Sequence, residues 1–139
     1  MMNDYDNSNV DINFENYFTT KKPQLLSEAR ISELPNSIEG HILVCGIVKG
    51  IKNLILPLRL KTLGTQKRPI VILCNGTMDD EAISSDTYLW NEINRFEDIF
   101  IIKGSALNPA DLEKARVSKA KAIIILAKSS IQSKKQGGP

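Results

Sequence analysis

The chain has 139 residues, of which 42% are hydrophobic and 24% are charged, which fits one ordinary domain with one core and excludes two large domains. Its apolar runs are far shorter than the ~18 residues needed to cross a bilayer, and its opening residues do not form a secretion signal, so we expect a soluble segment with no membrane insertion of its own. A formal net charge of +2 without clustered arginines gives no indication of nucleic-acid binding.

The chain begins with a polar stretch. Residues 1–22 are rich in Asn and Asp, and their apolar residues show no helical spacing, so we expect a disordered tail. Residues 23–39 then lead into the domain. Their apolar positions predict a short docking helix that ends before Pro35, because the residue before a proline avoids the helical region.

Four short apolar runs, rich in β-branched residues, have the pattern of strands buried on both faces of a parallel sheet. They cover residues 41–45, 69–74, 99–102 and 120–126. A helix is expected after each of the first three strands. Pro57 lies inside the apolar stripe of the first helix and should kink or end it. That stripe consists of Ile51, Leu54, Ile55 and Leu58.

The second expected helix begins at the acidic residues 79–81, which favour a helix amino terminus. Its buried face consists of Leu89, Ile93 and Phe96. The third helix covers about 109–116, with Asn108 as its cap and Pro109 at its first position. A hydrophobic contact between Leu107 and Leu112 would fix the entry to this helix.

Alternating strands and helices imply parallel βαβ units with right-handed crossovers. We therefore predict an α/β fold over residues 40–127, a Rossmann-like parallel sheet with strand order 3-2-1-4. A complete doubly wound sheet would continue beyond the fourth strand, so the fold is incomplete at its carboxyl-terminal end and the strand within 120–126 forms an open edge. The chain is then part of a longer fold, or this edge is covered by its own tail or by a partner. Residues 128–139 show no periodicity and are expected to be frayed.

The first strand-to-helix turn, residues 46–50, is where the glycine pattern of a nucleotide-binding site would lie. The dinucleotide fingerprint needs a second glycine that lets the backbone approach the pyrophosphate, and Val48 stands at that position. The acidic residue that would bind the ribose is also missing at the end of the second strand, where Cys74 and Asn75 lie. We therefore expect no cofactor-binding residues and no cofactor in this segment.

No catalytic residue is expected either. His41, the only histidine, begins a strand and is expected to satisfy a hydrogen bond instead of performing chemistry. Cys45 and Cys74 end neighbouring strands, and we interpret them as small buried residues, because no further ligand for a metal or redox pair is at hand. Two cysteines cannot build a disulfide framework, which favours a reducing cytosolic setting.

One acidic pattern in the tail has the spacing of a calcium-binding loop, but Asn9 stands where that loop needs glycine. We interpret the pattern as part of a solvated tail, and no metal ligand is assigned. The residues concerned are Asp4, Asp6, Ser8 and Glu15.

Several segments together resemble an RCK (regulator of potassium conductance) domain, in particular the second such domain of the BK or Slo family of large-conductance calcium-activated potassium channels. The resemblance covers about residues 40–127, and residues 23–39 match the segment that leads into such a domain. It rests on the run 40–45, the Leu-Pro-Leu-Arg sequence within 54–59, the spacing of Trp90, Ile93 and Phe96, and the run 104–112.

The resemblance implies a regulatory, non-enzymatic role on the cytosolic face of a membrane, as part of a channel. Its partners would be other RCK domains of the same channel, in a tetrameric gating ring, and the pore domain. Ion binding would change the shape of this ring and move the pore gate, with calcium as the ion of the intact channel. The calcium ligands of the second domain lie in an acidic stretch with no counterpart here.

An alternative is a nucleotide-sensing RCK module of the kind that regulates potassium transport. Such a module would bind NAD(H) or ATP at the carboxyl ends of the strands, and Val48 argues against it. The residues that would contact the nucleotide are Gly46, Ile47, Gly104 and Ser105.

Overall fold

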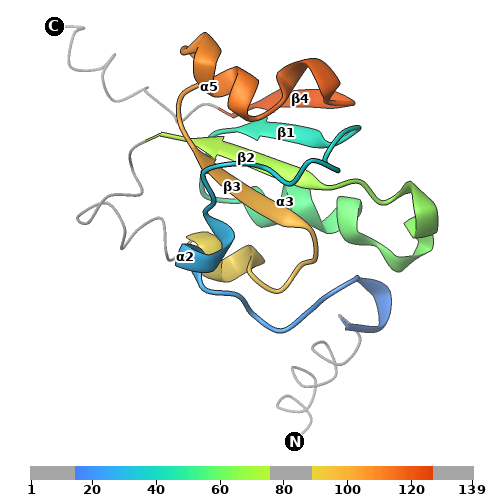
Figure 1. Cartoon of the computed structure of the whole chain (residues 1–139). Coiled ribbons are helices and arrows are strands. Elements are labelled where there is room, and N and C mark those ends of the chain that lie inside the picture. Colours follow the sequence, from blue (N-terminus) through green and yellow to red (C-terminus); the bar gives the residue numbers. More distant parts are fainter. Residues whose placement is uncertain (1–14, 76–88, 127–139) are drawn as a thin grey trace, which may run out of the picture.

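The computed structural model describes residues 15–75 and 89–126. These residues form a parallel four-stranded sheet in the order β3-β2-β1-β4, which confirms the predicted Rossmann-like architecture and strand order (Figure 1). The strands are β1 (Ile42–Cys45), β2 (Ile70–Cys74), β3 (Ile99–Lys103) and β4 (Ala122–Ile125). Ile42 pairs with both Ile70 and Ala122, so the strands begin level and their carboxyl ends lie along one edge.

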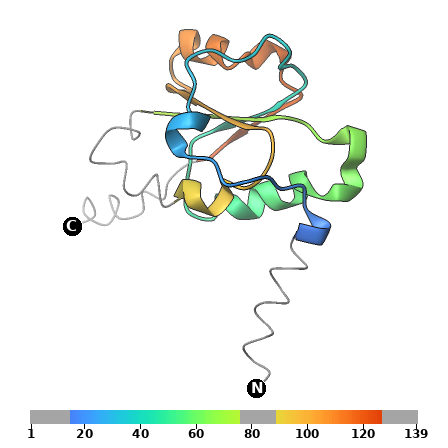
Figure 2. The ribbon, with the colours of Figure 1, turned by 60° about the horizontal axis from the view of Figure 1, so that its bottom comes forward.

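The central strands β1 and β2 are covered on both faces of the sheet, which explains why they are apolar throughout. On one face, β1 and β2 pack with α3 (Ile51–Ile55) and the helical residues 89–93. On the other face, they pack with residues 34–38 and α5 (Pro109–Lys114). Figure 2 shows α3 and α5 on opposite sides of the sheet.

Proline ends the first helix as expected. α3 stops at Ile55 and the chain continues as a 3-10 helix, η1 (Leu56–Arg59), with Pro57 in its first turn. A second 3-10 segment, η2 (Lys61–Gln66), then leads to β2. Gly50 caps α3 with φ of 89°, a left-handed conformation that glycine adopts without steric cost.

The other two helices match their predictions in part. Asn108 caps α5 by accepting a hydrogen bond from the amide of Ala110 at 2.9 Å, and Pro109 is its first residue, as expected. The predicted contact of Leu107 is wrong, because this side chain is 92% exposed and buries almost no area. The predicted helix start at 79–81 lies outside the described residues. Ile93 and Phe96 are both buried as predicted, although Phe96 follows the helical residues 89–93.

The lead-in to the domain is more ordered than the sequence suggested. The helix α2 has four residues, Leu26–Ala29, and ends well before Pro35. The boundary of the tail at residue 22 is placed too late, because Phe18 already forms an isolated bridge with Leu60, and Thr20 with Phe96. We call residues 18–38 the lead-in strap, which runs along the side of the sheet in Figure 2. Residues 1–14 of the first predicted tail, residue 127 of the predicted domain and the whole predicted tail 128–139 lie outside the described residues.

The fourth strand is the exposed edge that the sequence predicted. Among the described residues β4 pairs with β1 alone, and Ile123 and Ile125 are 48% and 71% exposed. Ile124 points to the other face and packs partly against the core beside α3. None of the described helices is both long and apolar enough to span a bilayer.

Candidate functional site

Ligands of open α/β sheets bind beyond the carboxyl ends of the strands, so this edge was the expected place for a site. Gly46 follows β1 with φ of 114°, and a Cβ there would lie 3.0 Å from the carbonyl oxygen of Leu126. The close approach of the chain after β4 therefore explains this glycine without a ligand.

Gly104 and Ser105 follow β3 and are engaged by α5. The carboxylate Oδ2 of Asp111 accepts a hydrogen bond from the amide of Ser105 at 2.9 Å. A Cβ on Gly104 would lie 2.6 Å from Cγ of Asp111, so glycine is needed for this contact. A carboxylate at this position repels a phosphate and already occupies the amide that would bind one.

The residues named for the nucleotide alternative do not surround one crevice. Gly46 and Ile47 follow β1, whereas Gly104 and Ser105 follow β3, and β2 lies between the two strands. Adjacent strands are ~4.8 Å apart, so the two pairs are about two strand spacings from each other. The structure places all four at the carboxyl edge without bringing them together.

His41 is a buried residue that makes a long-range hydrogen bond. Its ring is 0% exposed, and Nε2 lies 2.9 Å from the carbonyl oxygen of Ala115, to which Nε2–H donates. Among the described residues, Nδ1 has no hydrogen-bond partner. Burial, together with the charge of Arg116, outweighs the hydrogen bond and lowers the pKa of His41. The ring is therefore neutral at physiological pH and joins β1 to the end of α5.

The two cysteines lie on opposite faces of the sheet. Cys45 packs among the residues beside α5, whereas Cys74 packs beside α3, and both are buried and outside any disulfide. Burial raises the pKa of the Cys45 thiol, which disfavours its reactive thiolate form. Within residues 15–75 and 89–126, no three His, Cys, Asp or Glu side chains meet in a way that could hold a metal ion.

An arginine to which the sequence analysis gave no role holds the lead-in strap. Arg116 has a left-handed backbone with φ of 54°, and its guanidinium donates to main-chain oxygens of the strap. The acceptors are the carbonyl oxygens of Leu34 at 3.0 Å, Ile38 at 3.0 Å and Pro35 at 2.5 Å. No sequence pattern predicts these bonds, because the partners are main-chain groups about 80 residues away.

Arg59 is a buried arginine, and its guanidinium binds main-chain oxygens of the core instead of the strap. It is 0% exposed, and its Nε donates to the carbonyl oxygen of Glu97 at 2.6 Å and its Nη2 to that of Asp98 at 3.1 Å. Burial lowers the pKa of Arg59 to about 10, so the group is still charged at neutral pH. The carbonyl oxygen of Arg59 accepts a hydrogen bond from the amide of Thr19 at 2.7 Å, which ties the start of the strap to η1.

The middle of the strap is attached to the core as well. Trp90 is buried, and its indole Nε1 donates to the carbonyl oxygen of Gln24 at 2.7 Å. The amide of Ile31 donates to the carbonyl oxygen of Ile101 at 2.8 Å, beside a parallel bridge between Arg30 and Ile101. Hydrogen bonds therefore attach the strap to the core at its middle as well as near its ends.

Comparisons with known proteins place this geometry among channel domains. The family model of the calcium-activated potassium channel slowpoke-like RCK domain matches residues 37–137. A solved structure titled "Structure of the human SLO3 gating ring" is similar with a TM-score of 0.67 at 20% sequence identity. The match covers 83% of this chain and 22% of that chain, and at this identity it shows a common fold. No curated protein matches the sequence.

Proposed function

Because the chain belongs to the slowpoke-like RCK domains of calcium-activated potassium channels, we propose that it is a non-enzymatic regulatory domain that couples ion binding to the opening of a potassium pore. The observation that carries this proposal is the extent of the family match. Residues 37–137 include all four strands and both helical layers of the fold.

The proposed setting is a gating ring on the cytosolic face of a membrane. This chain spans 22% of the SLO3 gating-ring chain that it resembles, so most of such a ring would come from other segments. Its partners would be further RCK domains of a tetrameric channel and the pore domain. Calcium would bind outside the residues described here and act on them through the ring.

The proposed mechanism needs a differential affinity and a mechanical link. Calcium that binds the open-gate ring more tightly than the closed one shifts the equilibrium towards opening, with coupling energies of about 1–3 kcal/mol typical of such systems. The lead-in strap supplies the link, because Arg116, Trp90 and the β3 bridge fix it to the sheet. A rotation of the domain then pulls on the segment before residue 18.

Recordings from the full-length channel in excised membrane patches test this proposal. Arg116→Ala removes the guanidinium that holds residues 34–38, and we expect it to reduce calcium-dependent activation by about 1 kcal/mol of coupling, while single-channel conductance stays unchanged. Lys119→Ala is the matched control, because Lys119 is an exposed cation three residues away. Potassium currents that do not respond to calcium in the parent channel would contradict the role, as would equal activation in Arg116→Ala and Lys119→Ala.

The nucleotide-sensing alternative has no specific observation in its favour. The amide of Ser105 is bonded to Asp111, and Gly46 is separated from Gly104 by a strand. Thermal unfolding of the chain with NAD, NADH and ATP distinguishes the two roles, because a ligand that binds the folded state raises the melting temperature. We expect no change, and a rise with any of the three would favour the alternative.

A further inference from the structure

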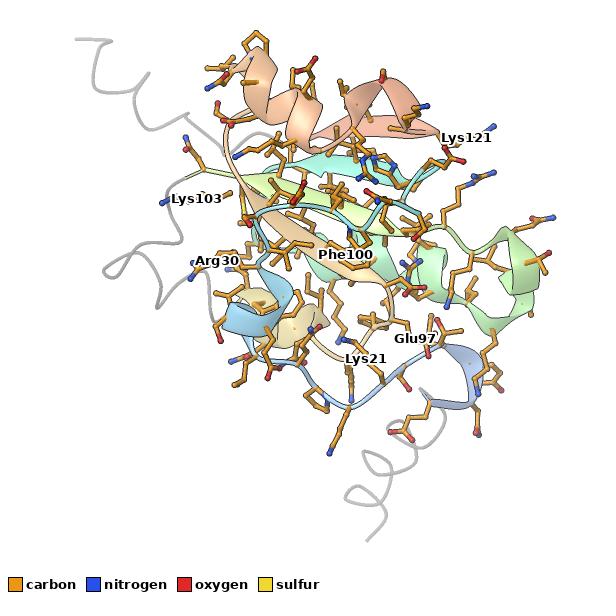
Figure 3. The ribbon with its side chains drawn as sticks, in the orientation of Figure 1. Lys21, Arg30, Glu97, Phe100, Lys103 and Lys121 are labelled. Carbon is orange, nitrogen blue, oxygen red and sulfur yellow. The ribbon has the colours of Figure 1, made fainter. Side chains whose placement is uncertain are left out.

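A short turn between α5 and β4 carries cationic side chains on both sides of one serine. The turn is the 3-10 segment η4 (Val117–Lys119), and Ser118 is exposed within it. The cations within four residues of Ser118 are Lys114, Arg116, Lys119 and Lys121. Figure 3 shows Lys121 projecting outwards at the edge where the strands begin, at the opposite end of the sheet from Lys103. Some protein kinases select their substrates by such a pattern of charge.

The hydroxyl of Ser118 is available for modification. The hydrogen bonds that hold the described turn join main-chain atoms. The amide of Lys119 donates to the carbonyl oxygen of Arg116 at 3.0 Å, and the amide of Ala120 donates to that of Val117 at 3.3 Å. Because η4 has three residues and lies outside the sheet, it can open locally and enter a kinase without unfolding the strands.

The same turn holds the end of the lead-in strap from both sides of Ser118. Two residues before this serine, the guanidinium of Arg116 donates to carbonyl oxygens of residues 34–38. One residue after it, the carbonyl oxygen of Lys119 accepts a hydrogen bond from the amide of Gly40 at 2.8 Å. A new charge on Ser118 would therefore lie beside the groups that hold the strap.

We propose that Ser118 is a phosphorylation site, and that its phosphate draws the guanidinium of Arg116 away from the lead-in strap. The modifying enzyme is a serine kinase that selects cationic segments, with ATP as the phosphoryl donor. The hydroxyl oxygen of Ser118 forms a bond to the γ-phosphorus, and the bond from this phosphorus to the β-γ bridging oxygen breaks. ADP leaves, and the hydroxyl proton passes to a base of the kinase and then to water. The site is a property of this chain and does not depend on the proposed role in a channel.

The phosphate offers Arg116 a stronger acceptor than the strap does. A phosphoserine carries about −1.5 to −2 charges at neutral pH, and hydrogen bonds between two charged groups are roughly twice as strong as those between neutral ones. The planar guanidinium also matches two phosphate oxygens at once. Arg116 lies two residues before Ser118, so rotation about its side-chain bonds brings the guanidinium to a phosphate there. The carbonyl oxygens of residues 34–38 then lose their donor, and this part of the strap opens.

Incubation of the folded 139-residue chain with ATP and the catalytic domain of protein kinase A or protein kinase C tests the site. We expect a phosphate on Ser118, located by mass spectrometry. The pair Lys119→Ala/Lys121→Ala removes two of the flanking cations and should slow this modification. Lys49→Ala/Lys61→Ala is the matched control, because it removes the same charge at exposed positions outside the turn, and it should be modified as fast as the parent.

Two results of this experiment would overturn the proposal. One is a folded chain in which neither kinase modifies Ser118, whether or not a peptide of residues 112–123 is modified. The other is equal slowing in the two pairs of lysine variants, because the flanking cations would then not be what the kinase selects. Circular dichroism of each variant checks that it is folded.

Hydrogen exchange on a chain synthesised with phosphoserine at position 118 tests the effect on the strap. In the unmodified chain the amide of Ile38 donates to the carbonyl oxygen of Pro35, and the amide of Gly40 to that of Lys119. We expect both amides to exchange at least about tenfold faster with the phosphate, as for the loss of one charge-assisted hydrogen bond. In Arg116→Ala the guanidinium is already absent, so the phosphate should add no further change.

Three outcomes of the exchange experiment contradict the transfer of Arg116 and overturn the proposal. The first is equal exchange with and without the phosphate. The second is an increase of the same size in Arg116→Ala as in the parent, since the phosphate would then act without this guanidinium. The third is an increase spread evenly over β1 and β2, which would mean that the phosphate unfolds the sheet instead of releasing the strap.

Discussion

Trp90 connects the hydrophobic core to the lead-in strap. Its ring is 1% exposed, and its indole Nε1 donates to the carbonyl oxygen of Gln24 at 2.7 Å. We expect Trp90→Ala to lower the free energy of unfolding by about 3–5 kcal/mol, because it leaves a large cavity beside β2 and β3. Chemical denaturation monitored by circular dichroism measures this loss.

Trp90→Phe separates the two contributions of that side chain. Phenylalanine retains most of the buried area but has no donor for the oxygen of Gln24, so the loss should be smaller than for alanine. A change below about 1 kcal/mol in Trp90→Ala would mean that the ring is not packed in the core.

His41 predicts how stability depends on pH. Its pKa in the folded state is lowered from the ordinary value of 6.5, mainly by burial, so the unfolded chain takes up a proton at a higher pH than the folded one. The contribution of the neutral His41 ring to stability is complete above pH 6.5, the ordinary pKa of histidine. It decreases as the pH falls below 6.5, because the unfolded chain then binds a proton that the folded chain does not. We expect the free energy of unfolding to fall in acid from this pH downwards.

His41→Gln is the variant that isolates this effect. Glutamine keeps an amide donor for the oxygen of Ala115 but has no group that titrates in this range. The decrease in stability just below neutral pH should therefore be weaker in His41→Gln than in the parent, as measured by denaturation at a series of pH values. Parallel pH profiles for the parent and His41→Gln would show that the pKa of His41 is the same in the folded and unfolded states.

The lead-in strap is the element whose order depends on single side chains. We expect Arg116→Ala to expose the amides of residues 34–38 to hydrogen exchange, because three main-chain oxygens lose their cationic donor. Exchange in the central strands β1 and β2 should change little. Lys119→Ala provides the comparison, and a uniform increase across the whole chain in Arg116→Ala would indicate global destabilisation instead of release of the strap.

The four strands could be read from the sequence, but the strap could not. Strands buried on both faces leave continuous apolar runs, such as Val71 and Ile72 in β2, and Pro57 marks the end of α3 by its own chemistry. The path of the strap is set by Arg116 and Trp90, which meet it from distant parts of the chain. The contact predicted between Leu107 and Leu112 was wrong for a related reason. A local sequence pattern does not say whether the rest of the fold covers the end of a helix.

Among the residues that the structure describes, nothing pairs with the outer edge of the four-residue strand β4. An exposed apolar edge is a template for pairing with another chain, and Ile125 is 71% exposed there. We expect the isolated 139-residue chain to associate with itself as its concentration rises, and Ile125→Lys to suppress this association. Analytical ultracentrifugation over a range of concentrations measures both.

Leu107→Lys is the control for this edge. Leu107 is 92% exposed and precedes α5, away from the strand edge, so its replacement adds the same charge without blocking strand pairing. Equal suppression by the two lysines would mean that net charge governs association, and a monomeric parent at all concentrations would mean that the edge is already protected.

The topology of the whole sheet could be predicted from the sequence, whereas the hollows on its surface could not. Strand order 3-2-1-4 results from βαβ handedness and the order of the apolar runs. Two hollows beside β3 are each lined by residues from the strap and from β3, and one of them also by Lys114 of α5, so no single stretch of sequence contains either. The opposite faces of Cys45 and Cys74 follow from strand alternation once their register is known.

Arg116 holds the strap by its carbonyl oxygens, and every residue type carries such an oxygen. Evolutionary drift can therefore change the side chains at positions 34, 35 and 38 without removing an acceptor for Arg116, provided that the buried volume is kept. Arg116 itself has no such freedom, since lysine lacks the planar fork that reaches several oxygens. In distant relatives the arginine and the path of the strap should be retained together, even where the amino-acid sequence of the strap is no longer similar.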